Sequence, residues 1–493
     1  MLFRIRNLAL LLFATFFCLS GFVFASTANA GWYAWSMDTG RANLTENEGK
    51  ATVKVTSTGK RPWSIKAGKD VIPLEKGKAY KVAFNASATS RTRVETAVEM
   101  RKDPYYRYSG GRYFTLDTEP RQYSFTFTMR QNSDSDAMFC FYLGYVDLVT
   151  ITVDSFAISC LGDAPADVIP TDFTRPEREA MSRGIQFGLQ FACPLEGAYG
   201  PELREEYFDV IKKDGRFDTI RLPVWWEYHT QKKAPYAVDP EYLRRVDWAV
   251  SNALHRGYYT ILNMHWFRAL EQNPAANKDE YLAVWKQISE YFKDYPDYLY
   301  FEILNEPNGK LDEYWNRYLV ECYDLIRKTN PARTIIIPGP CWANMDHIAS
   351  LSLPERVTKD PNVMIEFHPY SPNDFCFQGS PGNGSEDTRN IRWRGTNAEK
   401  KRITNSLDAM LAWSAKNNSV RLFAGEFCAQ AVPPAAHGSL REDRLRWVRF
   451  VRDACERRGI PWNYYDFCEE GSKVYDIATG EWDAELMDAL FFD

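Results

Sequence analysis

The sequence predicts a multidomain protein, with an N-terminal jelly-roll-like β-sandwich followed by a (β/α)8 TIM barrel. Three observations predict this: the length, a front part of short alternating runs, and a back part in which apolar strands alternate with long amphipathic segments. The 493 residues are more than one core usually organises. Hydrophobic residues make up 45% of the chain and charged residues 25%, which excludes disordered, collagen-like and coiled-coil classes.

The front domain, residues 31–160, consists of short runs that alternate apolar and polar side chains. The clearest runs are 51–55, 80–84, 122–128 and 149–153. Turn-rich stretches separate them, and no stretch is long enough for a helix, which is typical of an antiparallel sandwich. Residues 161–180 contain three prolines without periodicity. We expect this segment to be a linker that lets each domain fold by itself.

The back domain, residues 181–493, repeats a strand, a loop and a helix in units of about 39 residues. The eight strand candidates begin near Gly184, Thr219, Tyr258, Leu299, Thr334, Val363, Leu422 and Ile460. Long amphipathic segments such as 281–295, 314–329 and 441–458 fall between them. Eight such units predict a closed parallel barrel, and chemistry in such barrels collects at the C-terminal ends of the strands.

Residues 1–30 have the parts of a cleavable signal peptide: Arg4 and Arg6, an apolar run over 8–24, and the site Ala28-Asn29-Ala30. A membrane anchor is the competing interpretation. We expect export, to the periplasm or the extracellular space, and no stable membrane association after cleavage.

The formal net charge is −5, so we expect no nucleic-acid partner; we also expect a monomer. No Cys-x-x-Cys spacing indicates a zinc site. Cys140 and Cys160 could pair, but the sequence does not decide any disulfide.

Polar residues stand at the ends of five predicted barrel strands. They are Arg221, His265, Asn305 with Glu306, His368 with Tyr370, and Glu426. Glu306 and Glu426 lie 120 residues apart, about three units, which places them on strands four and seven across the barrel mouth. Two carboxylates that flank one acetal are the arrangement for glycoside hydrolysis: one donates a proton to the leaving oxygen and the other attacks the anomeric carbon.

Residues 184–490 resemble the cellulase-type glycoside hydrolases of family 5, which belong to a large clan of retaining barrel enzymes. The matching pieces are Arg221-Leu222-Pro223-Val224, Asn305-Glu306-Pro307, His368-Pro369-Tyr370, Gly425-Glu426-Phe427 and Val474-Tyr475-Asp476 before Trp482. Five short motifs in this order make the resemblance specific.

The resemblance implies a role for each matching residue. Glu306 would be the acid/base, Glu426 the nucleophile, Asn305 a hydrogen-bond partner of the sugar 2-hydroxyl, Arg221 the cation that keeps Glu426 ionised, Tyr370 a donor to the nucleophile, His368 a support for the acid/base, and His265 a contact at the cleavage subsite. The resemblance implies no metal and no cofactor.

Other candidates near the strand ends have plainer interpretations. Glu302 and Glu366 would be buried structural carboxylates. Trp226, Trp266 and Trp342 follow strand ends, where they would stack on sugar or pack a loop. The eighth strand departs from the family pattern W-x-Y-W-x-F: Tyr465 takes the floor position of the second Trp and would stack with less area.

The front domain resembles carbohydrate-binding modules of the family 4 and 9 type, on stretches such as 61–65, 77–84 and 149–156. Its candidate stacking residues are Trp63, Tyr105, Tyr106 and Tyr108; the alternative is that the domain only packs against the barrel. We therefore expect an endo-acting, retaining hydrolase of β-1,4-glucan. A β-mannanase, a mixed-linkage β-glucanase and a non-catalytic polysaccharide-binding protein remain alternatives.

Overall fold

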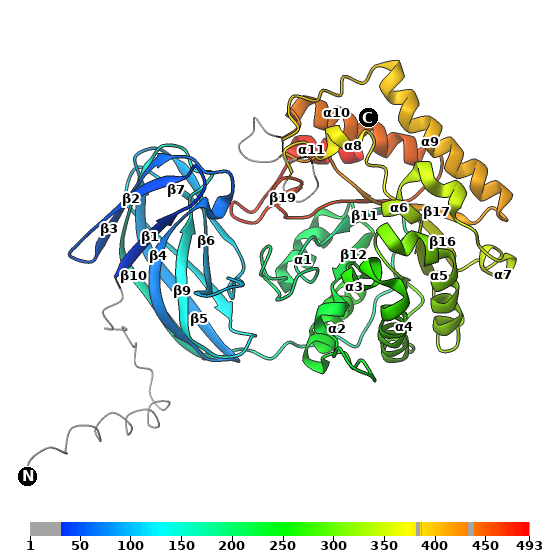
Figure 1. Ribbon diagram of the computed structural model, residues 1–493, viewed down its shortest axis with the longest axis horizontal. Helices are drawn as coiled ribbons and strands as arrows, with labels where there is room; N and C mark the ends of the chain where they lie inside the picture. Colours follow the sequence, from blue (N-terminus) through cyan, green and yellow to red (C-terminus); the bar gives the residue numbers. More distant parts are fainter. Residues whose placement is uncertain (1–30, 381–384, 386, 432–437, 493) are drawn as a thin grey trace, which may run out of the picture.

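A computed structural model describes residues 31–380, 385, 387–431 and 438–492 of the chain. A β-sandwich and a barrel stand side by side, with the β19 hairpin of the barrel reaching toward the sandwich (Figure 1). The expected signal peptide, residues 1–30, lies outside the described residues. In the described part, no helix has the length and apolar character needed to cross a membrane.

The sandwich consists of two five-stranded antiparallel sheets, with the orders β1-β4-β9-β6-β7 and β2-β3-β10-β5-β8. The strands are β1 Trp32–Ser36, β2 Arg41–Asn47, β3 Lys50–Ser57, β4 Ile65–Leu74, β5 Lys78–Ala88, β6 Thr92–Met100, β7 Arg112–Leu116, β8 Arg121–Thr128, β9 Asp134–Tyr142 and β10 Thr150–Asp163, with a 3-10 turn Pro62–Ser64 before β4. Each of the four clearest runs of the sequence lies within or overlaps one of these strands. Strand β10 continues to Asp163, three residues beyond the expected end of the domain.

Alternation along the strands gives the first sheet two different faces. One face contributes Phe139 and Phe141 to the apolar core between the sheets. The opposite face contains the ion pair between Lys66 and Glu99, and the loop 101–111 lies over it, since Arg107 of that loop pairs with Glu95. We call this opposite face, defined by Lys66, Glu95, Glu99 and Tyr142 together with Arg107, the covered face.

Eight parallel strands close the barrel, and each begins within two residues of its predicted start. They are β11 Arg183–Gln186, β12 Thr219–Val224, β13 Tyr259–Met264, β14 Leu299–Glu302, β15 Ile335–Pro338, β16 Val363–Phe367, β17 Arg421–Phe427 and β18 Trp462–Tyr464. The predicted architecture is therefore confirmed.

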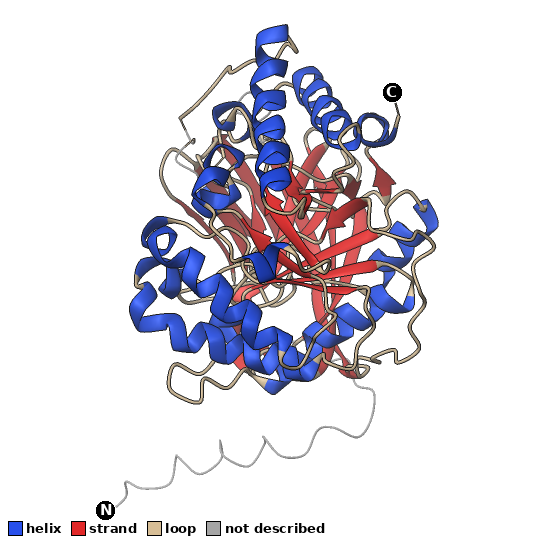
Figure 2. Cartoon of the chain, turned by 90° about the vertical axis from the view of Figure 1, so that its right-hand side faces the viewer, coloured by secondary structure: helices blue, strands red, loops and turns tan. Residues whose placement is uncertain are grey.

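Helices surround the barrel strands (Figure 2). The α-helices are α1 Glu205–Asp214, α2 Pro240–His255, α3 Arg268–Gln272, α4 Pro274–Tyr291, α5 Asp312–Arg327, α6 Pro340–Ala343, α7 Glu355–Thr358, α8 Asn373–Cys376, α9 Asn397–Lys416, α10 Arg441–Glu456 and α11 Ala484–Phe491; 3-10 turns cover Trp226–His229, Gly309–Leu311 and Met345–Ser350, and a hairpin pairs β19 Tyr475–Asp476 with β20 Glu481–Trp482. Helix α9 begins with a reciprocal capping box between Thr396 and Glu399, which satisfies backbone donors that a helix start leaves unpaired.

The sandwich docks on loops at the mouth end of the barrel. Arg112 pairs with Glu202 of the loop after β11 across a nearly solvent-free contact of 3.3 Å. Arg93 pairs with Asp476 and Glu470, which follow β18, at 2.6 Å and 2.7 Å. A domain held by its linker alone would not bury such a pair, so the two domains form a docked unit.

The nine described cysteines are all free thiols, so Cys140 and Cys160 are not bridged. They lie on β9 and β10, which belong to different sheets.

Candidate active site

The C-terminal ends of the barrel strands bring the predicted polar residues to one mouth. Packing there is tight: a side chain at Gly425 of β17 would overlap the Glu366 carboxylate of β16, with its Cβ 1.6 Å from Oε1. Glycine at this position therefore lets the neighbouring strand place a carboxylate beside Glu426. Glu302 and Glu366 are fully buried, as the sequence predicts for structural carboxylates.

Arg221 is the buried centre of the site. Its guanidinium donates to both oxygens of Glu302, at 2.7 and 2.5 Å, and to Glu426 Oε1 at 2.5 Å. It also donates to Asn305 Oδ1 at 2.7 Å and to Gln186. A guanidinium with several acceptors fixes the orientation of each, so Arg221 holds the nucleophile candidate and Asn305 in one geometry.

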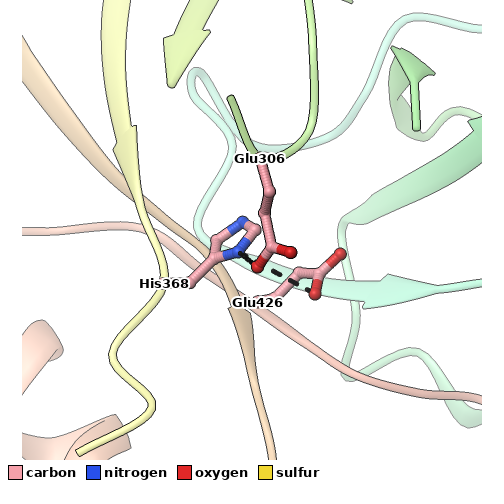
Figure 3. A group of neighbouring side chains, drawn as sticks. All are labelled: Glu306, His368 and Glu426. Atoms are coloured by element: carbon pink, nitrogen blue, oxygen red, sulfur yellow. Dashed lines mark hydrogen bonds and ion pairs between the residues drawn. The ribbon is translucent and has the colours of Figure 1, made fainter. Parts of the chain in front are cut away.

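Glu306, His368 and Glu426 point toward one another from three separate segments of the mouth (Figure 3). His368 Nδ1 lies 2.6 Å from Glu306 Oε1 and 3.9 Å from Glu426 Oε2, while Nε2 lies 3.3 Å from Glu366 Oε1. Carboxylate oxygens of Glu306 and Glu426 come within 4.8 Å of each other. Glu306 keeps 27% of its side chain exposed, whereas Glu426 keeps 6%.

The two carboxyl groups have opposite shifts in pKa. Burial raises the pKa of Glu306 above its ordinary value, and its hydrogen bond to His368 only partly opposes the rise. Burial also opposes ionisation of Glu426, but the charges of His368 and Arg221 outweigh it and lower the pKa to about 2. Although burial works against the imidazolium, Glu426 and Glu306 raise the pKa of His368 to about 10. The two carboxyl groups therefore differ in their tendency to hold a proton, with Glu306 favouring the protonated form more than Glu426 does.

Two further candidates flank these groups. The Tyr370 hydroxyl donates to Glu426 Oε2 at 3.2 Å. His265 is nearly buried, with Nδ1 3.1 Å from Asn263 Oδ1, and burial lowers its pKa to about 3, so it is neutral.

The tryptophan candidates separate into different environments. Trp226 is fully buried and its indole N–H donates to the carbonyl of Asn263, so it packs the barrel and cannot stack on a ligand. Trp266 is partly exposed, with the guanidinium of Arg268 3.9 Å from its ring centre. Trp342 is 56% exposed, and its backbone N–H donates to the carbonyl of Pro307, next to Glu306.

The backbone around Trp342 is strained. Cys341, Trp342 and Ala343 all have left-handed backbone angles, with φ of 54°, 60° and 53°. Each such residue costs about 1–2 kcal/mol relative to the right-handed form. The exposed indole at the mouth is therefore held by a segment of unfavourable backbone conformation.

Tyr465, at the floor position, hydrogen-bonds through its hydroxyl to Glu469. Glu469 also approaches Gly188, and burial raises its pKa to about 7. Glu469 is not recognisable from the sequence, because it follows the eighth strand in a loop without a motif. Asn263, which donates to Glu302, was missed in the same way; it lies two residues before His265 in the same strand.

In the described residues, one group of His, Cys, Asp or Glu side chains could jointly ligate an ion: Glu306, His368 and Glu426. The group coincides with the carboxylate pair described above.

The four candidate stacking residues of the sandwich do not form one common surface. Tyr108 is buried in the sandwich core and donates to Asp134, so it cannot bind a ligand. Trp63 and Tyr105 are exposed. Tyr106 lies against the barrel, with its ring edge-to-face to Tyr199.

Two close carboxyl groups with opposite shifts in pKa, at the mouth of a (β/α)8 barrel, are the arrangement of a barrel glycoside hydrolase. A family model described as Cellulase (glycosyl hydrolase family 5) matches residues 182–471, more than half of the chain. The chain belongs to glycosyl hydrolase family 5. A second model, described as Carbohydrate binding domain, matches residues 21–150, so the front domain is of the carbohydrate-binding type.

Similar proteins agree with this assignment. Endoglucanase H of Acetivibrio thermocellus is 31% identical over 66% of this chain and 34% of that protein. The Cellulase/esterase CelE of the same organism is 29% identical over 50% of this chain and 31% of that protein. The chain thus spans about a third of the length of these two relatives. Among solved structures, Thermotoga maritima Cel5A in complex with mannotriose is 34% identical over 63% of this chain and 97% of that chain, with a TM-score of 0.59.

Proposed function

We propose that this protein is an exported endo-β-1,4-glucanase that acts by a retaining double displacement. The observation that carries the proposal is the pair Glu306 and Glu426, whose oxygens come within 4.8 Å and whose pKa values are shifted in opposite directions. Carboxyl groups about 5–5.5 Å apart act by retention, whereas inverting pairs need about 6.5–9.5 Å to admit water between them. The short separation favours retention.

In the first step Glu306 gives its proton to the glycosidic oxygen while Glu426 attacks the anomeric carbon and forms a glycosyl ester. In the second step Glu306, now ionised, takes a proton from water, and the water displaces Glu426. Arg221 and Tyr370 hold the nucleophile by the hydrogen bonds described above, and His368 orients Glu306.

The remaining residues would contact the sugar. The side-chain oxygen of Asn305 accepts from Arg221, so the amide N–H groups of Asn305 would be the atoms that donate to a sugar 2-hydroxyl. His265, being neutral, would contact the sugar at the cleavage subsite. Tyr465, Trp266 and Trp342 would stack on sugar rings.

The substrate is the finer part of the proposal. The names of the similar proteins favour β-1,4-glucan. The same catalytic residues would serve a β-mannanase or a mixed-linkage β-glucanase. Because the Thermotoga protein was solved with mannotriose, mannan remains an alternative substrate. A purely polysaccharide-binding role is less well supported, since binding alone would not require two carboxyl groups tuned in opposite directions.

The test is a reducing-sugar assay of the full chain on β-1,4-glucan, mixed-linkage glucan, mannan and xylan, followed by proton NMR of the fresh product. We expect the fastest release from β-1,4-glucan and the β-anomer first. Faster release from mannan would change the substrate, and α-anomer first would contradict retention. Cleavage at Ala30 and export are tested by N-terminal sequencing of protein recovered outside the cytoplasm.

A further inference from the structure

We propose that six aromatic side chains, three from each domain, form one surface that binds a β-linked glucan chain beyond the cleavage site. These residues, which we call the rim track, are Trp225, Tyr228 and Tyr199 of the barrel and Tyr106, Tyr105 and Trp35 of the sandwich. The proposal rests on the proposed function, because the bound chain is the substrate that Glu306 and Glu426 would cleave.

On the barrel side the rim track begins at the catalytic mouth. The ring of His265 lies 5.2 Å from that of Trp266, which lies 6.1 Å from that of Trp225. Trp225 in turn lies 5.6 Å from Tyr228. Both Trp225 and Tyr228 follow β12, the strand that contributes Arg221. Aromatic contacts therefore lead without a break from the cleavage site to the rim.

The rim track crosses from barrel to sandwich at Tyr106. Its ring lies edge-to-face against Tyr199, with ring centres 6.5 Å apart. Burial raises the pKa of its hydroxyl, and the hydroxyls of Tyr228 and Tyr199 are close enough to raise that pKa further. Both partners are on barrel loops. The next residue toward the N-terminus, Tyr105, stacks on Trp35 of β1, with ring centres 6.4 Å apart and planes 30° apart. The loop that carries both tyrosines is anchored by Arg107, which donates to Glu95 at 2.5 Å.

The docking of the two domains fixes this crossing. Gly110, in the same loop, packs backbone against backbone on Gly197: a Cβ on Gly197 would lie 3.0 Å from Gly110 Cα. Gly111 N–H donates to the carbonyl of Gly200 at 3.3 Å. These contacts, with the buried pair Arg112–Glu202, hold the ring of Tyr106 against the barrel.

Exposure distinguishes the rim track from ordinary packing. Eight aromatic side chains of the described residues are between 36% and 56% exposed, and four of them belong to the rim track: Trp35, Tyr105, Tyr199 and Tyr228. Isolated exposed aromatics are ordinary, but a contiguous exposed strip indicates a binding surface.

A sugar chain suits this strip better than a protein does. Pyranose rings have apolar faces for stacking and hydroxyl groups at their edges, and tyrosine offers both a flat ring and a hydroxyl. The strip also continues directly into the cleavage site, as a polymer that passes through the site requires. In this arrangement the sandwich lengthens the binding surface of the barrel.

The test compares chain lengths in the full protein. We expect Tyr106→Ala and Trp225→Ala each to lower the ratio of kcat/KM on a β-1,4-linked glucohexaose to kcat/KM on a trisaccharide by about 2- to 10-fold, the effect of losing one aromatic contact. Phe492→Ala, which removes an exposed aromatic outside the rim track, should keep the wild-type ratio. Trp225→Ala leaves the interface residues intact, so it separates loss of a ring from loosened docking.

A binding measurement keeps the test independent of hydrolysis. Calorimetric titration of the Glu306→Gln protein with the hexaose should give a Kd that Tyr106→Ala raises about 2- to 10-fold. If the wild-type protein cleaves no glucan while Tyr106→Ala still raises this Kd in the Glu306→Gln protein, the proposed function is rejected and the rim track is kept. An unchanged ratio and an unchanged Kd in both track variants would overturn the rim track. So would self-association in light scattering that Tyr106→Ala abolishes, since the strip would then bind a second copy.

Discussion

Both domains bury a network of charged side chains, but only one network opens to solvent. On the covered face of the sandwich, Lys66 pairs with Glu99 and Arg107 with Glu95, each at 2.5 Å. Both cations also lie over the ring of Tyr142, at 4.9 Å and 4.4 Å. The loop 101–111 lies over the cluster, and each cation has its own carboxylate.

At the barrel mouth, carboxylates outnumber the arginine that they face. Arg221 faces three carboxylates, those of Glu302, Glu366 and Glu426, and Glu306 stands partly exposed beyond them. A surplus of carboxyl groups in a small space forces them to differ in protonation. The comparison teaches that buried charge alone does not mark a catalytic site; unequal charge at an opening does.

The largest expected effect separates the carboxylates of the two networks. Glu426→Gln and Glu306→Gln should each reduce kcat by about 100-fold or more, because nucleophile and general acid are then missing. Glu99→Gln, in the sandwich, should leave kcat per folded molecule at the wild-type value. Initial rates on soluble β-glucan measure all three; a barrel variant with a tenth of the wild-type rate would contradict the assigned roles.

The next effect concerns stability in both networks. Arg221→Met and Lys66→Met each leave buried carboxylates without their cation, which typically costs about 3–5 kcal/mol. We expect similar losses in the free energy of unfolding by urea. Only Arg221→Met should also abolish hydrolysis. Equal losses of activity would mean that the covered face supports the active site.

The pH profile tests the unequal protonation. Activity should fall at high pH as Glu306 loses its proton and at very low pH as Glu426, whose pKa is about 2, gains one. His368 lowers the pKa of both groups, so His368→Asn should raise both pKa values and move both limbs of kcat/KM to higher pH. Tyr291→Phe, on the outer surface, serves as control. If both limbs of the pH profile stay in place in His368→Asn, His368 does not control the pKa values of Glu306 and Glu426.

A smaller effect is expected at Trp342. Cys341→Gly should stabilise the protein by about 1 kcal/mol, because glycine adopts a φ of 54° without the left-handed penalty. The same change frees the loop, so kcat/KM should fall a few-fold. Thermal unfolding and polymer hydrolysis measure the two effects; higher stability with unchanged activity would show that the position of Trp342 does not matter.

The smallest effect concerns Glu469. With a pKa of about 7, it gains negative charge as the pH rises through neutrality, close to Tyr465 and Glu426. Glu469→Gln should remove the inflection near pH 7 from the kcat/KM profile and change the rate at pH 5 little. Glu470→Gln, the neighbouring residue, is the matched control. An inflection that persists in Glu469→Gln would assign it to another group.

The sequence was sufficient for the barrel because apolar runs at regular spacing and strand-end motifs are local signals. The same signals predicted that Arg221, Glu306, His368 and Glu426 would lie together at the barrel mouth. The sequence alone does not decide whether Trp226 stacks on sugar or packs a loop, because Trp225 and Trp226 are adjacent and chemically identical. The structure buries Trp226 and leaves Trp225 partly exposed at the rim. The docking of the sandwich depends on pairs about 90 to 380 residues apart, such as Arg93 with Asp476, for which one sequence holds no local pattern.

The facing glycines Gly110 and Gly197 bear on how this protein can be recombined. The domains of modular enzymes are often treated as exchangeable, with the linker as their only connection. Here the joint is a close backbone contact, and a partner with any side chain at either position would be held off the surface. A chimera with a foreign sandwich would keep the linker but lose this docking contact. We therefore expect the two domains to have evolved together rather than to be exchangeable.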